Sequence, residues 1–309
     1  MAKGAIILLF FAFIAISSVH LLPRKDFVKP NSPENIERLQ HLGPNDLAEE
    51  LSGQFEGDIV IPPEELEELL SGRGGRTGLL NERFRWPDNI VPYEIRDGYF
   101  NTSQKNYITL GVQKLMDVTC LKFVPYDPNV HTNYVYITGA NTGCHSMVGM
   151  RGGGQQLNLQ PNSLEIGCFR LYTIVHEFMH AIGFYHMQSA TERDEYVKIV
   201  LENIEPGKEH NFNTYDSTVI SQYGVEYDYG SVMHYSKTAF SINGEDTIVP
   251  IKDLSNNTMG QRLRMSDKDV ARINAKYCPY VPEKRPIKFS ELFKLMNQKI
   301  NNLFQTIFQ

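Results

Sequence analysis

Three histidines and one glutamate lie close together in the stretch HEFMHAIGFYH, from His176 to His186. On a helix His176 and His180, four residues apart, project from one face, where both rings can hold a divalent metal. Glu177 is offset by about a quarter of a turn and can reach a metal-bound water without binding the metal, as a general base must. Gly183 can adopt the left-handed backbone that ends a helix and returns His186 as a third ligand. Three nitrogen ligands and an open position predict catalytic rather than structural zinc.

The competing interpretation is a core helix that happens to carry histidines, because a five-residue H-E-x-x-H pattern recurs by chance. Here the pattern continues to a glycine and a third histidine at fixed spacing. Downstream, SVMHY places Met233 two residues before Tyr235 in a polar, turn-like setting, which resembles the Met-turn of metzincins. The combination favours the metal site.

Four motifs together resemble one family within the metzincins, the astacins: HEFMHAIGFYH, SVMHY, ERDEYV after the third histidine, and RWPDNIVPYEI further upstream. The resemblance covers roughly Thr77 to Cys278. It implies that one zinc ion per catalytic domain is held by three ligands, His176, His180 and His186. It further implies Glu177 as the base, Tyr235 as a mobile fifth ligand that turns to the oxyanion of the transition state, and Met233 as a hydrophobic base under the metal.

The resemblance also implies a metzincin or zincin-like α+β fold of two subdomains. A twisted, mostly parallel five-stranded sheet with helices would lie above an active-site cleft, and an irregular subdomain below it. The residue pattern agrees, since Val91–Ile95 and Tyr134–Ile137 are rich in β-branched and aromatic residues and predict strands. Ser103–Cys120 has an apolar stripe at helical spacing, and Ser266–Tyr277 begins with a capping-box spacing, so both predict helices. Glu202–Tyr229 lacks periodicity and suits the irregular half.

Residues 1–18 predict a secretory signal peptide, with Lys3 at a positive start and the apolar run Ala5–Ile16 before small residues. The alternative, a membrane anchor, needs about 20 apolar residues, more than this run supplies. We therefore expect a secreted, extracellular protein without a transmembrane segment, in which Asn101 and Asn256 are candidate glycosylation sites. A net charge of −6 argues against a nucleic-acid partner.

Residues 19–76 are acidic and proline-rich and predict a propeptide. The run PPEELEELL is followed by SGRGGR, a loop of small and basic residues of the kind that proteases cut. Arg73 and Arg76 are therefore candidate processing sites. The resemblance favours an activating protease that cuts after Arg76 and a mature chain that starts at Thr77.

Within this propeptide, FEGDI at Phe55–Ile59 resembles the inhibitory motif of astacin propeptides. A carboxylate is a competent zinc ligand. In the zymogen Asp58 would occupy the open position of the metal and displace the water until the segment is cut away, and Gly57 would permit the close approach. Taken alone, the pentapeptide could also be an ordinary turn.

The stretch Arg151–Gln160, RGGGQQLNLQ, joins a glycine-rich loop to a short strand. In astacins the corresponding strand forms an edge of the cleft. An exposed edge offers unpaired N–H and C=O groups, so an extended peptide would bind by strand addition. The alternative is a plain hairpin with a flexible turn.

The four cysteines allow three pairings, and in a secreted chain they are more often bridged than free. A zinc site built from their thiols is disfavoured because no C-x-x-C pair is present. The astacin resemblance implies two disulfides, Cys120 with Cys278 and Cys144 with Cys168.

The sequence departs from the astacin pattern at Met187, where the family normally has a glutamate that meets the ammonium of the mature N-terminus. A thioether cannot neutralise a cation, and an unpaired buried ammonium is costly. We therefore expect the amine of Thr77 to stay solvated or to find another carboxylate, with Glu192 and Asp194 nearby in sequence.

These observations predict a monomeric zinc endopeptidase made as a zymogen, with residues 77–278 as its catalytic domain and an extended protein or peptide as its substrate. Residues 279–309 carry apolar side chains at helical spacing and predict an amphipathic helix that packs on its own domain, rather than on a partner or a membrane surface. The alternatives are a catalytically silent peptide-binding module on the same fold and a hydrolase of non-peptide bonds.

Overall fold

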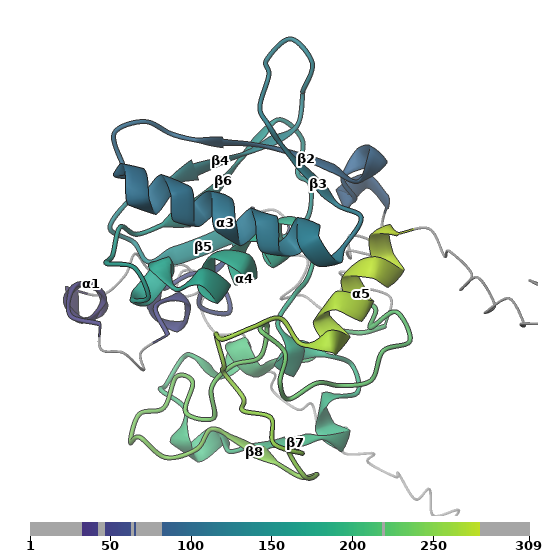
Figure 1. Cartoon of the computed structure of the whole chain (residues 1–309). Coiled ribbons are helices and arrows are strands. Elements are labelled where there is room, and N and C mark those ends of the chain that lie inside the picture. Colours follow the sequence, from purple (N-terminus) through teal and green to yellow (C-terminus); the bar gives the residue numbers. More distant parts are fainter. Residues whose placement is uncertain (1–32, 43–46, 63–64, 66–81, 218–219, 279–309) are drawn as a thin grey trace, which may run out of the picture.

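The structure is a computed structural model that describes residues 33–42, 47–62, 65, 82–217 and 220–278 (Figure 1). Its helices are α1 (Pro33–Gln40), α3 (Thr102–Val118), α4 (Leu171–Ala181) and α5 (Asp267–Tyr277). Its strands are β1 (Ile59–Val60), β2 (Ile90–Ile95), β3 (Lys122–Pro125), β4 (Tyr134–Thr138), β5 (Cys144–Met147), β6 (Gly154–Leu159), β7 (Val197–Ile199) and β8 (Ile248–Pro250). The predicted signal peptide, the junction of Arg76 and Thr77, and the C-terminal tail lie outside the described residues.

The larger of the two sheets in the described part of the chain has the strand order β1-β5-β6-β4-β2-β3. Five of these strands come from residues 77–278, and all of their pairings are parallel except that of β5 with β6. This confirms the predicted mostly parallel five-stranded sheet. The sixth strand, β1, comes from the upstream segment and pairs in parallel with β5, with Ile59 opposite Ser146.

The prediction that the strand within Arg151–Gln160 forms the edge of the cleft was wrong. The glycine-rich loop at Arg151–Gly153 reverses the chain, so that β6 lies inside the sheet between β5 and β4. The outermost strand of residues 77–278 on this side is therefore β5, which precedes the loop in sequence. The edge of β5 that faces away from β6 is free of any strand from residues 77–278, and it pairs with β1 of the upstream segment.

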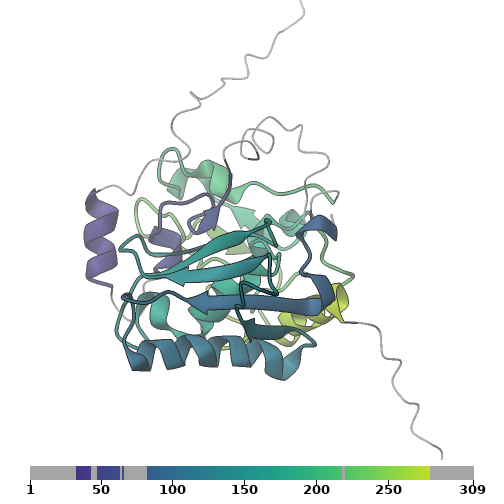
Figure 2. The ribbon, with the colours of Figure 1, turned by 90° about the horizontal axis from the view of Figure 1, so that it is seen from above.

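Helices α3 and α4 cover one face of this sheet, and α3 runs along its length in Figure 2. The apolar stripe of α3 is buried, as its helical spacing predicts. The helix begins at Thr102, and Asn101 caps it with its side chain and shares a capping box with Gln104. From α4, Phe178 sets its ring edge-on to that of Phe123, with 5.4 Å between the centroids.

The two helices approach closely where Gly111 of α3 meets Ile174 of α4. A Cβ atom at Gly111 would lie 2.6 Å from the Cγ2 of the fully buried Ile174. We expect Gly111→Val to lower the free energy of unfolding by about 1–3 kcal/mol, because overpacking outweighs the few tenths of helix propensity gained. Urea unfolding measures the change. Thr109→Val, an exposed β-branched replacement on the same helix, should change it by less than about 0.5 kcal/mol.

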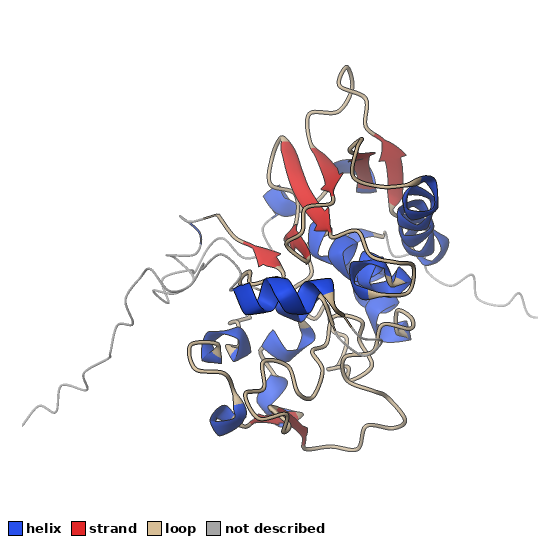
Figure 3. Ribbon diagram, turned by 90° about the vertical axis from the view of Figure 1, so that its left-hand side faces the viewer, coloured by secondary structure: helices blue, strands red, loops and turns tan. Residues whose placement is uncertain are grey.

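The lower half of the molecule holds little regular structure, as predicted. In Figure 3 the strands β7 and β8 lie at its base among loops and short 3-10 helices such as Leu201–Asn203 and Glu209–Phe212. Helix α5 begins with the predicted capping box, in which the side chains of Ser266 and Asp269 each accept from the other's backbone N–H. Together the two halves form the expected pair of subdomains.

Two disulfides lie in the upper half. Cys120 is bonded to Cys278 across 158 residues of sequence, and Cys144 to Cys168 across 24. This is the pairing that the astacin resemblance implies. The first bridge joins the end of α5 to the start of β3, and the second joins the edge strand β5 to the turn before α4.

Candidate metal centre

Helix α4 carries the first part of the centre. Its last residue is Ala181, and the backbone then turns through Gly183, which has φ +97° and donates its N–H to the carbonyl of His180 at 2.7 Å. This left-handed turn brings His186 back beside the helix. His176, Glu177 and His180 are completely buried, and His186 is 2% exposed.

The first two imidazole rings are oriented by backbone carbonyls. The Nδ1 of His176 lies 2.8 Å from the oxygen of Val232, and the Nδ1 of His180 lies 2.7 Å from the oxygen of Phe184. A carbonyl only accepts, so both Nδ1 atoms carry the proton and both Nε2 atoms present lone pairs. These Nε2 atoms face each other at 3.1 Å. Two lone pairs cannot hydrogen-bond, whereas zinc–nitrogen bonds of about 2.0–2.1 Å in a tetrahedron put nitrogens about 3.3 Å apart.

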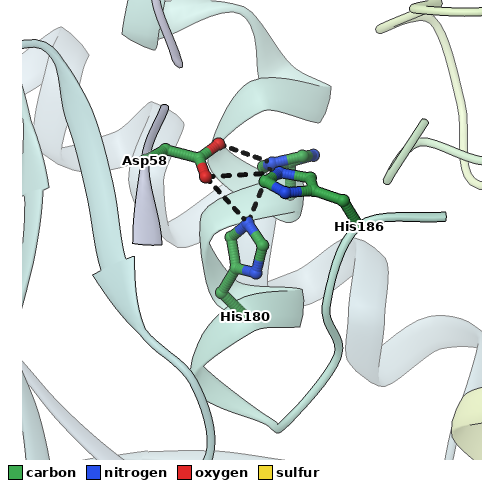
Figure 4. Close-up of side chains that lie close together, drawn as sticks. Asp58, His180 and His186 are labelled. Atoms are coloured by element: carbon green, nitrogen blue, oxygen red, sulfur yellow. Dashed lines mark hydrogen bonds and ion pairs between the residues drawn. The ribbon is translucent and has the colours of Figure 1, made fainter. Parts of the chain in front are cut away.

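Asp58, from the upstream segment, completes the group (Figure 4). Its carboxylate oxygens lie 3.0, 3.4 and 3.2 Å from the Nε2 atoms of His176, His180 and His186. Both the Oδ1 of Asp58 and the Nε2 of His186 are buried without a hydrogen-bond partner. Four ligand atoms that converge in this way, two of them otherwise unsatisfied, fit one zinc ion.

The charges agree with a cation at this point. Burial lowers the pKa of His176 to about 4, so its ring is a neutral ligand near neutral pH. Burial opposes ionisation of Asp58, yet the His186 and His180 rings hold the pKa of its carboxyl well below its usual range. Burial alone would lower the pKa of His186, but the carboxylates of Asp58 and Glu56 outweigh it and raise the pKa to about 9. The carboxylates of Asp58 and Glu56 thus favour a positive charge at or beside the His186 ring.

Glu177 lies beside this group and does not belong to it. Both of its carboxylate oxygens are buried without a hydrogen-bond partner. Burial raises the pKa of Glu177 well above its usual range, and the negative charge of Asp58 raises it further. A raised pKa means that the carboxylate of Glu177 has a high affinity for a proton. Since it has no partner in the protein, it can take that proton from a water that enters the site.

The turn that contains SVMHY forms the floor of the centre. Met233 is 3% exposed and its carbonyl accepts from the N–H of Met187 at 2.9 Å. Tyr235 is 1% exposed, its ring centroid lies 4.8 Å from that of His186, and its hydroxyl donates to the carbonyl of Glu56 at 2.6 Å. With the upstream segment in place, the hydroxyl of Tyr235 is therefore bonded to that segment.

Sequence reasoning missed Glu56. Its carboxylate accepts from Nδ1 of His186 at 2.9 Å and from the hydroxyl of Tyr215 at 2.5 Å, and its backbone N–H donates to Asn211 at 3.1 Å. It is completely buried and has φ +47°, a conformation that few residues other than glycine adopt. A carboxylate behind a metal-binding histidine fixes the ring and raises its basicity. Glu56 could have been identified from its place in FEGDI, two residues before Asp58.

Other predicted residues do not contribute ligand atoms. Met187 is 3% exposed and packs beside the centre in an apolar cluster that contains Tyr235, while Asp194 is exposed and paired with Arg193. Asn101 and Asn256 are exposed, so both sequons are accessible. No helix within the described ranges is long and apolar enough to cross a membrane.

Comparison with known proteins agrees with this geometry. Residues 79–278 match the family described as Astacin (Peptidase family M12A). The chain is 40% identical over 247 residues to zinc metalloproteinase nas-4 of Caenorhabditis elegans, which covers 79% of this chain and 75% of nas-4. It is 38% identical over 242 residues to nas-15 of the same organism, covering 75% of this chain but 41% of that protein.

Among solved structures, the high choriolytic enzyme 1, a hatching enzyme zinc-protease from Oryzias latipes (Medaka fish), superimposes with a TM-score of 0.57 at 34% sequence identity. The match covers 64% of this chain and 96% of that one. The fold and the buried histidines thus define a zinc metallopeptidase. Within that class, the chain belongs to the astacin family.

Proposed function

We propose that the chain is a secreted endopeptidase made as a zymogen, with residues 1–18 as signal peptide, 19–76 as propeptide and 77–278 as the catalytic domain. The observation that carries this proposal is the position of Asp58 among the three histidines, at 3.0–3.4 Å from their Nε2 atoms. A carboxylate placed there excludes water and substrate from the metal. Cleavage after Arg76 would release the segment and expose the centre.

The path of the propeptide supports a peptide as substrate. Its residues Ile59 and Val60 pair with the free edge of β5, and Phe55 and Ile59 pack in an apolar cluster with Val148 and Tyr215. An edge that accepts one extended chain by backbone hydrogen bonds offers the same groups to another. The free edge of β5 is thus the proposed substrate edge, in place of the strand Gly154–Leu159.

Glu177 is the proposed general base. The zinc ion, when bound, supplies Lewis acidity and makes water reactive near neutral pH. The carboxylate of Glu177 would take the proton of the attacking water and deliver it to the leaving amine. Because both of its oxygens lack partners in the protein, it is free to bond water and substrate.

Tyr235 is the proposed stabiliser of the oxyanion. In the zymogen its hydroxyl is held by the carbonyl of Glu56, so loss of the propeptide releases that donor. A phenol hydroxyl that reaches developing negative charge lowers the barrier because it binds the transition state more strongly than the substrate.

Metal removal tests the proposal. The chain that begins at Thr77 should cleave an extended peptide at internal bonds, lose this activity when a chelator removes the metal, and regain it with added zinc. The thermal midpoint should fall on chelation, because the facing lone pairs of His176 and His180 lose the cation between them. Cleavage that persists in the metal-free protein would contradict the proposal.

A further inference from the structure

We propose that Arg151 forms a subsite for an acidic side chain of the substrate, at a distance from the bond that is cut. This inference rests on the proposed peptidase function and adds a substrate class: polypeptides with a glutamate or aspartate on one side of the scissile bond. In the zymogen the carboxylate of Glu65 occupies this subsite, 2.5 Å from the guanidinium of Arg151.

Arg151 is fixed before any ligand arrives. Its guanidinium lies 4.6 Å from the ring centroid of the buried Phe84, and its charge acts on the hydroxyl of Tyr185, the residue before the third histidine. Its backbone N–H donates to the side chain of Gln155 at 2.9 Å, and Gln155 in turn donates to the carbonyl of Gly149 at 2.9 Å. A charge held in this way loses little side-chain entropy when it binds an anion.

The side chain of Arg151 is more buried than that of a surface arginine. With the propeptide in place it is 8% exposed, and its Nε is buried without a hydrogen-bond partner. In the described ranges Glu65 is the carboxylate with which it forms an ion pair. Once the propeptide leaves, this guanidinium has lost its counter-charge but keeps its position, which leaves a preformed site for another carboxylate.

The surrounding charge adds to the attraction. A second guanidinium, that of Arg83, lies 4.3 Å from the centroid of the same Phe84 ring. Its positive charge lies at the same ring as that of Arg151. Glu65, the propeptide residue that pairs with Arg151, belongs to the acidic run PPEELEELL.

The geometry places the subsite along the substrate edge. Because β1 runs parallel to β5, the propeptide leaves Asp58 in the direction of the loop that follows Met147 and contains Arg151. That loop abuts the metal helix, since the N–H of Gly149 donates to the carbonyl of His180 at 2.9 Å. A substrate that follows β5 in this way would bring to Arg151 a side chain several residues from the scissile bond.

The experiment uses the chain from Thr77 and a neutral peptide with one glutamate placed in turn at each of five positions on either side of the cut. The wild-type protein should cleave one such peptide about five- to tenfold more efficiently than its glutamine counterpart, mainly through KM, since the contact is remote from the reacting bond. Arg151→Gln should abolish this preference and keep the rate on the neutral peptide, and Arg151→Lys should retain part of it. Arg151→Glu should prefer lysine at the same position, which a misfolded variant could not do.

Lys122→Gln removes a positive charge at the opposite edge of the sheet, on β3, and should leave the preference unchanged. If the wild type cleaves the neutral peptide but glutamate brings no gain at any position, or if Arg151→Gln keeps the gain, the inference is overturned while the proposed function stands. Arg151 would then serve only to hold the propeptide. If the wild type cleaves none of the peptides, the proposed function fails first, and this inference with it.

Discussion

Glu177→Gln in the chain that starts at Thr77 should lower kcat by about 10²–10⁴-fold and leave the metal in place. The reason is that the amide cannot accept a proton from water, whereas it fills the same volume. Neither carboxylate oxygen has a hydrogen-bond partner, so the replacement breaks no bond within the protein. It also removes a buried acid, and the variant should therefore be at least as thermally stable as the wild type.

The measurement combines peptide cleavage with metal content and thermal midpoint on the same sample. His176→Gln serves as the contrasting variant, because it should lose metal and stability together with activity. An activity within tenfold of wild type in a metal-loaded Glu177→Gln protein would exclude this residue as the base. If instead the wild type and the variant cleave equally little while both hold the metal, the interpretation of the fold as a peptide-binding module would return.

The second large effect concerns latency. In a chain kept uncut by Arg73→Gln and Arg76→Gln, replacement of Asp58 by alanine should raise the basal rate by about 10²–10³-fold. The variant loses an anion buried among three histidines, and removing one partner of such a buried set costs about 3–5 kcal/mol. Cleavage of a neutral peptide by the uncut chain measures the change.

Two further variants separate the parts of this block. Glu56→Gln should raise the basal rate by a smaller factor, because Asp58 still reaches the metal position while the bonds to His186 and Tyr215 weaken. Glu37→Ala, an exposed acid on α1, should have no effect. If Asp58→Ala leaves the uncut chain as inactive as before, while the chain from Thr77 is active, Asp58 does not provide the latency.

The ligand geometry was accessible from sequence because it is local. The spacing of His176 and His180 is set by helix periodicity, and the return of His186 by one glycine turn, so no distant contact had to be known. The same holds for the capping box at the start of α5. Such features depend on a few neighbouring residues.

Features that depend on pairing between distant segments were less accessible. The glycine-rich loop and the strand after it were recognised, but their place in the sheet depends on β4 and β5, and sequence alone does not state which strand lies outermost. Glu56 was missed for a related reason, since Tyr215 and His186 come near it only in the folded chain. Its left-handed backbone is likewise visible only in the structure.

The disulfide between Cys120 and Cys278 also fixes the position at which the catalytic domain ends. Cys120 leads into β3, which lies at the opposite edge of the sheet from β5. The bond anchors Cys278 there, with the whole width of the sheet between Cys278 and the proposed substrate edge. An affinity tag, a fluorescent protein or a surface tether joined after Cys278 should therefore leave the cleavage kinetics unchanged. The C-terminal side is thus the suitable attachment point for immobilising the enzyme.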